Sequence, residues 1–191
     1  KFENANNFNF GKYHALLIGI NEYENLEDLK TPQNDINRID KVLKQKYKFF
    51  TTKLLNPSRR ELLKEINKFA TTLSSNDNLI IYFAGHGMQK SDEGFWLTRE
   101  AQKKDDIDWI SVSRIKRKLR EIKANNILVI ADSCFSGLIT RGLNLQNETN
   151  QQTPIEILHK AKSRIAITSG SNEPVLDGGG GENSIFAASL V

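Results

Sequence analysis

The sequence predicts an α/β domain in which helices flank both faces of a mainly parallel sheet. Five apolar segments rich in β-branched residues are predicted as buried strands, at residues 13–20, 49–55, 78–81, 126–130 and 164–169. Stretches whose apolar residues recur with helical spacing lie between several of them. Near-continuous apolar strands that alternate with amphipathic helices are typical of parallel sheets covered on both sides. In such sheets ligands bind beyond the carboxyl ends of the strands, so functional residues are expected at that edge.

The first half of the chain supplies clear helix signals. Thr31 and Pro32 are predicted as the N-cap and first position of a helix. Ser58 and Glu61 have capping-box spacing and predict the start of a second helix after the second strand. The apolar stripe of the first helix is Ile36, Ile39, Val42 and Leu43, and that of the second is Leu62, Leu63, Ile66, Phe69 and Leu73.

The second half alternates in the same way. Residues 94–97 are predicted as a short hairpin strand on the surface, and residues 110–122 as a helix. Thr153 with Glu156 predicts a short helix, and a last helix is expected to begin near Asn183. Residues 138–152, rich in Asn, Gln and Thr, are expected to form an exposed loop and a candidate processing site.

The composition of the chain limits the classes of protein to which it can belong. A chain of 191 residues with 38% hydrophobic and 26% charged residues fits a single globular domain. No apolar run approaches the roughly 20 residues of a membrane span, and no signal-peptide core is present, so a cytoplasmic location without membrane contact is expected. The chain does not begin with Met, which suggests a fragment of a longer protein. Its single cysteine rules out an internal disulfide and multi-cysteine zinc sites.

Charged clusters do not predict a metal or nucleic-acid site. The basic residues at 116–123 are crowded on one helical stretch. A solvent-exposed helix face is favoured over a nucleic-acid site, because no aromatic residues that could contact bases are interleaved with them. Asp105, Asp106 and Asp108 offer oxygen ligands for calcium, but Lys103 and Lys104 precede them and the spacing is not that of a calcium loop. A solvated acidic turn or helix cap is therefore favoured, and no cofactor is expected to be required.

Reactive side chains follow two of the predicted strands. His86, flanked by Gly85 and Gly87, comes after the third strand, and Cys134 comes after the fourth. Alone, each residue is more typical of packing than of catalysis. Together they favour a cysteine hydrolase, in which Cys134 is the nucleophile and His86 protonates the leaving amine. The backbone amides of Gly87 and Cys134 are the expected oxyanion hole.

These segments resemble the caspase-like cysteine peptidases, in particular the metacaspases and bacterial caspase homologues. The separation of 48 positions from His86 to Cys134 agrees with the caspase separation of about 50. The resemblance implies a single caspase-like peptidase domain over residues 1–191 and a thiol protease. It extends over Leu16–Ile20, Asn34-Asp35, Gly85–Gly87, Asp132–Gly137 and Thr168–Gly170.

Substrate preference follows from charge. Asp132 lies two residues before Cys134 and is expected on the same side of the strand, where its carboxylate attracts a cationic substrate. Its alternative role is to accept bonds from local backbone amides. By the resemblance, Asp35 is a second acidic wall of a pocket for Arg or Lys. Its alternative role, weighed equally, is that of an acid in the first turn of a helix. The animal-caspase pattern Gln-Ala-Cys-x-Gly is absent, which argues against cleavage after aspartate.

The remaining expectations concern regulation and binding. Ser169, Gly170 and Ser171 resemble the segment that pairs with an extended substrate. Arg141 in the polar loop is a candidate for self-cleavage by a zymogen. Calcium activation, a regulatory partner or domain outside this chain, and a role in a stress or defence pathway are expectations at the family level. Two alternatives stay open: a catalytically silent caspase-like interaction module, and a related cysteine peptidase with another specificity.

Overall fold

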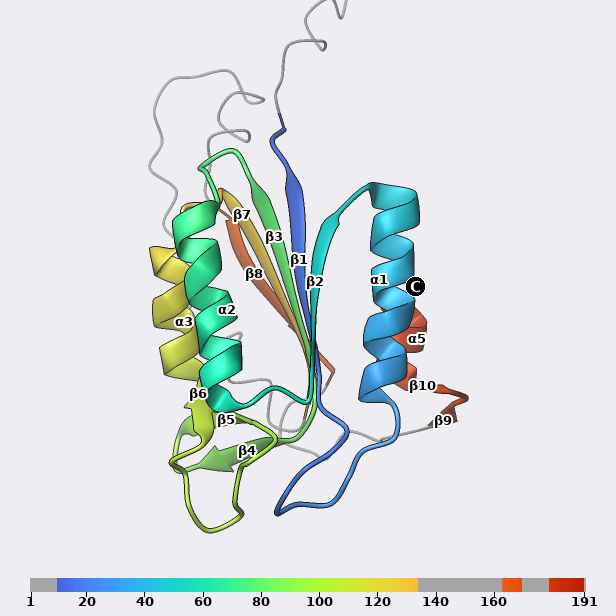
Figure 1. Ribbon diagram of the computed structural model, residues 1–191, viewed down its shortest axis with the longest axis vertical. Coiled ribbons are helices and arrows are strands. Elements are labelled where there is room, and N and C mark those ends of the chain that lie inside the picture. The colour runs from blue at the N-terminus through green and yellow to red at the C-terminus, as the bar shows by residue number, and fades with distance from the viewer. Residues whose placement is uncertain (1–9, 134–162, 170–178, 191) are drawn as a thin grey trace, which may run out of the picture.

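A parallel five-stranded sheet forms the centre of the protein. Figure 1 shows the computed structural model, which describes residues 10–133, 163–169 and 179–190. The strand order is β2-β1-β3-β7-β8, and every neighbouring pair is parallel. The strands are β1 (Tyr13–Gly19), β2 (Phe50–Leu55), β3 (Asn78–Ala84), β7 (Asn126–Asp132) and β8 (Ser163–Thr168).

Helices cover both faces of this sheet, which confirms the predicted fold class. The helices α2 (Arg59–Thr72) and α3 (Val112–Glu121) lie on one face, and α1 (Pro32–Tyr47) and α5 (Ile185–Leu190) lie on the other (Figure 1). The apolar stripe predicted for α2 is buried from Leu62 to Leu73. The capping box of α2 is present, whereas Thr31 precedes α1 without a side-chain capping bond.

The two faces of the sheet have separate cores. The larger core lies beneath α2 and α3 and includes Leu16, Ile81 and Val129. The smaller one lies beneath α1 and includes Leu17 and Tyr82. Consecutive residues of the same strand thus contribute to opposite cores, as strand geometry requires. This alternation directs the last residue of β7, Asp132, toward the side of α1.

A small antiparallel sheet continues from the carboxyl end of β3. Its strands are β4 (Gly87–Lys90), β5 (Glu93–Leu97) and β6 (Trp109–Ser111), in that order. The prediction that residues 94–97 lie on the surface is wrong, because Trp96 is only 1% exposed and stacks on Phe83 with ring centroids 4.3 Å apart. Residues 110 and 111 belong to β6 and not to the helix, since they pair with β5.

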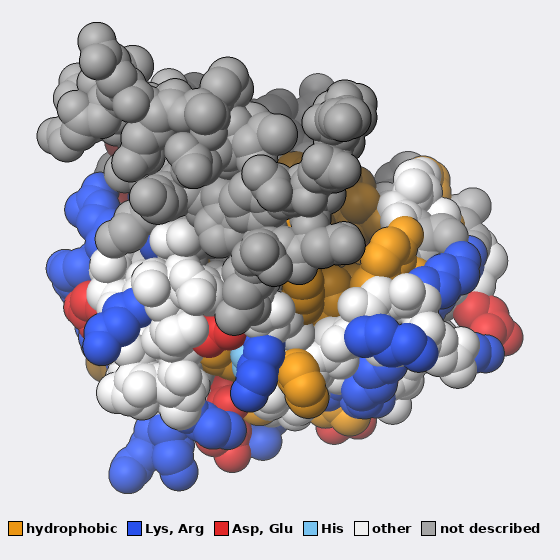
Figure 2. Space-filling view, turned by 90° about the horizontal axis from the view of Figure 1, so that it is seen from above, with side chains coloured by type: hydrophobic (Ala, Val, Ile, Leu, Met, Phe, Trp, Pro, Cys, Tyr) orange, Lys and Arg blue, Asp and Glu red, His pale blue; other side chains and the backbone are white. Residues whose placement is uncertain are grey.

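The C-terminal part differs from the expected helix start. Asn183 and Ser184 form β10, which pairs with β9 (Gly179–Gly180), and α5 begins only at Ile185. The loop predicted at 138–152 and the helix predicted from Thr153 lie outside the described residues. No helix in the described part of the chain has the length and hydrophobicity needed to cross a bilayer. Figure 2 shows Lys and Arg side chains around the rim of one face, with Asp and Glu among them.

Candidate active site

The carboxyl ends of β3 and β7 lie side by side. Ala84 pairs with Asp132 in the register of the two strands, and the Gly85 amide donates to the Asp132 carbonyl at 3.3 Å. His86 and Cys134 each lie two residues beyond this pair in the sequence. The sheet therefore brings the segments of both predicted catalytic residues to one edge. Cys134 itself lies outside the described residues, as do Gly170, Ser171 and Arg141.

The imidazole of His86 is oriented by a backbone carbonyl. Its Nε2 atom lies 2.8 Å from the carbonyl oxygen of Glu27. A carbonyl only accepts hydrogen bonds, so this contact requires the proton to be on Nε2 and leaves Nδ1 as the acceptor of the neutral ring. The orienting group is thus a main-chain atom, which sequence reasoning did not identify. Nothing in a sequence distinguishes one carbonyl from another.

Tyr23 provides the second contact to His86. Its hydroxyl oxygen accepts the backbone N–H of His86 at 2.7 Å, and the two rings are tilted with centroids 4.7 Å apart. Glu27 and Tyr23 belong to the same loop, between β1 and α1. Both contacts to the histidine therefore depend on the conformation of this one loop.

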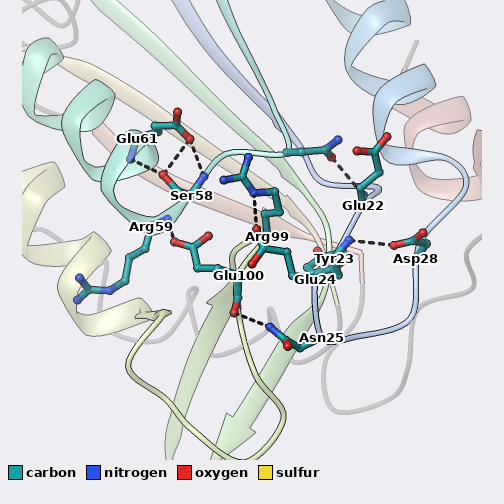
Figure 3. Close-up of polar contacts among 11 residues, drawn as sticks. Glu22, Tyr23, Glu24, Asn25, Asp28, Ser58, Arg59, Glu61, Arg99 and Glu100 are labelled. Atoms are coloured by element: carbon teal, nitrogen blue, oxygen red, sulfur yellow. Dashed lines mark hydrogen bonds and ion pairs between the residues drawn. The ribbon is translucent and has the colours of Figure 1, made fainter.

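Several bonds fix that loop (Figure 3). The backbone N–H of Tyr23 donates to Asp28 Oδ1 at 2.9 Å, which closes the loop on itself. Other bonds connect it to the segments that precede α2 and follow β5. They join Glu22 N to Asn56 Oδ1 at 3.3 Å, Asn25 Nδ2 to the Glu100 carbonyl at 3.1 Å, and Glu24 to Arg99 at 3.2 Å. Asn56 Oδ1 also accepts the Asn21 N–H, at 2.8 Å.

The two predicted pocket acids meet on the α1 side of the sheet. Asp35 in the first turn of α1 is 1% exposed, and Asp132 at the end of β7 is 7% exposed. Ser184 joins them: its backbone N–H donates to Asp35 Oδ1 at 3.0 Å, and its hydroxyl donates to Asp132 Oδ2 at 2.5 Å. The amide group of Asn183 also donates to Asp35 Oδ1, at 2.9 Å.

The second carboxylate oxygen of each acid lacks a hydrogen-bond partner of normal geometry among the described residues. These two oxygens, Asp35 Oδ2 and Asp132 Oδ1, are buried, and the buried hydroxyl of Tyr82 lies close to Asp132. Burial raises the pKa of Asp35 above its usual value, against the opposing effect of the bonds from Asn183 and Ser184. Burial likewise raises the pKa of Tyr82, and the neighbouring Asp132 and Asp35 add to the effect. Buried polar groups of this kind normally have partners, so the cluster is suited to a cation.

The hairpin that carries Ser184 is held against α1. Asn34 Nδ2 donates to the carbonyl of Glu182 at 3.0 Å, and Arg38 Nη1 donates to Asn183 Oδ1 at 3.2 Å. The Ser184 hydroxyl also accepts the N–H of Ala187 at 3.0 Å, in the first turn of α5. Sequence reasoning missed Ser184, Asn183 and Tyr82. The only local signal was a serine placed before a short helix.

The other predicted site residues lie at the same edge or outside the described part. Gly87 is the first residue of β4 and pairs with Trp96. Ser169 follows β8, and its backbone N–H donates to the Ala131 carbonyl at 3.1 Å. The Ser169 hydroxyl is buried without a partner among the described residues.

The acidic residues considered for calcium make ordinary contacts. Asp106 forms an ion pair with Lys90 at 2.6 Å, and Asp105 accepts the N–H of Ile107 at 3.0 Å. Within the described residues, no three His, Cys, Asp or Glu side chains are grouped so that they hold a metal ion.

Comparisons with known proteins point to one family. The family model described as the caspase domain matches residues 12–191. Metacaspase-8 of Arabidopsis thaliana is 24% identical over 161 residues, which covers 74% of this chain and 42% of that protein. Metacaspase-1 of Plasmodium falciparum is 33% identical over 91 residues, 41% of this chain and 15% of that protein. The chain spans less than half the length of these curated relatives. Among solved structures, protein GSU0716 of Geobacter sulfurreducens has the same fold, with a TM-score of 0.67, 18% identity, and coverage of 94% of this chain and 80% of that one.

Proposed function

This chain belongs to the caspase-domain family, and we propose that it is a cysteine endopeptidase that cleaves peptide bonds after Arg or Lys. The observation that supports this specificity most strongly is the pair of buried carboxylates, Asp35 and Asp132, each with one oxygen left without a partner among the described residues. A buried charge without a counter-charge is costly, so a cationic side chain that reaches this pair of acids is bound strongly.

His86 and Cys134 carry the proposed chemistry. The Nδ1 atom of His86, which Glu27 leaves unengaged, accepts the thiol proton of Cys134. The thiolate attacks the carbonyl carbon, and the backbone amides of Gly87 and Cys134 stabilise the oxyanion. The protonated His86 then donates its Nδ1 proton to the leaving amine, and the C–N bond breaks. Water hydrolyses the thioester with Nδ1 as base, which restores the free thiol and releases the carboxylic acid.

In this proposal, the pair of acids and the edge of the sheet hold two different parts of the substrate. The cation lies against Asp35 and Asp132, and the extended peptide pairs with the segment Ser169, Gly170 and Ser171. Asp132 is the last residue of β7, and Ser169 comes directly after β8, the strand that pairs with β7. Both sites therefore lie at the ends of neighbouring strands in the same sheet. Backbone pairing gives affinity to any extended peptide, and the acid pair selects the residue before the scissile bond.

We propose that the preference for cleavage after Arg or Lys also regulates the enzyme. Cleavage after Arg141 by the enzyme itself converts a zymogen into the active form, within a cytoplasmic stress or defence response. Calcium is an additional candidate activator. Incubation of the wild-type chain is expected to yield a fragment that ends at Arg141, whereas Cys134→Ala and Arg141→Gln remain intact. An intact wild-type chain, under conditions in which it cleaves arginyl peptides, contradicts self-cleavage.

The decisive experiment measures hydrolysis of fluorogenic peptides that end in Arg, Lys, Asp or Asn, with and without calcium. We expect turnover of the Arg and Lys peptides only, with complete loss in Cys134→Ala. Preference for Asp or Asn would contradict the proposed specificity and leave a related cysteine peptidase. A folded wild-type chain that cleaves no peptide, even after activation with calcium and limited proteolysis, would favour an interaction module instead.

A further inference from the structure

Tyr23 is placed to control the position of His86. Its side chain is 8% exposed and belongs to the larger core of the sheet. Its hydroxyl oxygen accepts the His86 N–H at 2.7 Å, and its ring lies against the imidazole with centroids 4.7 Å apart and planes at 49°. One side chain thus contacts both the main chain and the ring of the same histidine.

We propose that Tyr23 is a positioning residue that holds the His86 imidazole in its reactive orientation. The hydroxyl fixes the His86 backbone, from which the side chain projects, and the aromatic ring restricts rotation of the imidazole. The Glu27 carbonyl then accepts Nε2–H at 2.8 Å and selects the tautomer with Nδ1 unprotonated. This inference rests on the proposed function, because it assigns Tyr23 to the residue that transfers the proton.

Gly85 gives an independent reason to see the hydroxyl contact as specific. A Cβ atom built on Gly85 would lie 2.8 Å from the Tyr23 hydroxyl oxygen and 3.1 Å from Cζ of Phe83. The first distance is shorter than real Cβ contacts, so the tyrosine hydroxyl takes up the space that a side chain at position 85 would need. A side chain at position 85 would therefore have to displace the Tyr23 hydroxyl from its place beside His86.

The substitution that tests this proposal removes only the hydroxyl. Tyr23→Phe keeps the ring in the core, and it leaves the His86 N–H without its acceptor. We expect kcat for an arginyl peptide to fall about 10-fold, the effect of one lost hydrogen bond, while KM changes less than about twofold. The matched control is Tyr47→Phe, because Tyr47 is 61% exposed at the end of α1. This control is expected to match the wild type in both constants.

A double-mutant cycle tests the contact itself. Gly85→Ala is expected to lower kcat strongly, because the new methyl group forces Tyr23 away from His86. In the Tyr23→Phe background the same change is expected to cost less, since the hydroxyl oxygen that meets the methyl group is gone. Fully additive losses in the double variant would overturn the assignment, as would a Tyr23→Phe effect confined to KM.

A second readout does not require cleavage. In the Cys134→Ala background, long-range ¹H–¹⁵N spectra of the histidines report which ring nitrogen carries the proton, and His86→Gln assigns the signal. We expect the wild-type ring to be the Nε2–H tautomer, and Tyr23→Phe to populate both tautomers. If no peptide is cleaved but Tyr23→Phe changes the tautomer of His86 as expected, the proposed function is contradicted and the positioning role is supported. If arginyl peptides are cleaved and Tyr23→Phe changes neither kcat nor the tautomer, the positioning role is overturned.

Discussion

The histidine side and the acidic side of the sheet edge are built on different principles. His86 is held by neutral bonds, one to a backbone carbonyl and one to a phenol oxygen, and the loop that provides them closes through its own bonds. The acidic side buries Asp35 and Asp132 together and leaves one oxygen of each without a partner among the described residues. In the proposed function, the first side needs no substrate to hold its geometry, whereas the second gains a partner for its buried carboxylates when a cationic side chain binds.

This difference separates stability from activity in mutants. Changes at the histidine side are expected to remove catalysis while the fold stays intact. Changes at the acidic side are expected to remove substrate binding while stability rises or stays the same, because they remove a buried charge that has no ion-pair partner among the described residues.

The largest effect is expected for His86→Ala. Without the imidazole, no group transfers the proton between thiol and leaving amine, so kcat/KM for an arginyl peptide should fall about 10³-fold or more. The thermal midpoint should change by only a few degrees, because His86 is half-buried and lies at the edge of the core. Kinetics and thermal unfolding of the same preparation check both statements. Activity within tenfold of the wild type would place the proton-transfer group elsewhere.

The second-largest effect is expected for Asp132→Asn. The amide keeps an oxygen that accepts the Ser184 hydroxyl, but the negative charge is gone. We expect kcat/KM for Arg and Lys peptides to fall about 10²-fold, the usual cost of removing one partner of a buried charge pair. Uptake of iodoacetamide by Cys134 should be nearly unchanged, because it needs no cation pocket. An equal loss in both assays would assign Asp132 to the chemistry and not to specificity.

Asp35→Asn is expected to stabilise the free protein. Burial raises the folded-state pKa of Asp35, so the folded protein holds this proton more tightly than the unfolded chain does. Stability from this group is therefore present at low pH and is lost as the pH rises through the raised folded-state pKa. The variant should gain about 1 kcal/mol near neutral pH, and its advantage should shrink as the pH falls toward 3.8. Urea unfolding at several pH values measures this. A destabilised variant at neutral pH would show that the Asp35 charge is satisfied in the free protein.

The fold and the position of His86 could be predicted because their signals are local, whereas the contacts of His86 with Tyr23 and Glu27 join residues 63 and 59 positions apart and could not. Each strand of the main sheet was placed within a few residues, since an apolar run ends where the strand ends. His86 follows directly from the end of β3. The boundary of β6 was missed because residues 110 and 111 fit a helical stripe, and only their pairing with β5 makes them a strand.

The acidic side depends on long-range contacts, which a single sequence does not encode as a pattern. Asp35 and Ser184 are 149 residues apart, and their bond exists only because the β9–β10 hairpin docks on α1. The presence of Asp35 at a helix start fits both a helix-stabilising acid and a pocket wall. The structure shows Asp35 in the first turn of α1 and bonded to Ser184 and Asn183, which are residues that no local rule connects with it.

The smallest effect is expected in the loop that supports His86. Glu24 and Arg99 are 57% and 42% exposed, so their ion pair should contribute less than about 0.5 kcal/mol. Arg99→Gln should therefore change kcat/KM less than about twofold. The backbone bond between the Glu24 N–H and the Arg99 carbonyl, 2.9 Å long, survives any such substitution and keeps the loop in place.

Asp28→Ala is the matched change on the other side of the loop. It removes the acceptor of the Tyr23 N–H, so kcat should fall about three- to fivefold. Steady-state kinetics of the two variants side by side test whether the loop is held by the buried end of its hydrogen-bond network or by its exposed ion pair. An effect of Arg99→Gln as large as that of Asp28→Ala would mean that the exposed ion pair holds the loop as strongly as the bond to the Tyr23 backbone, and the contrast between the two sides would fail.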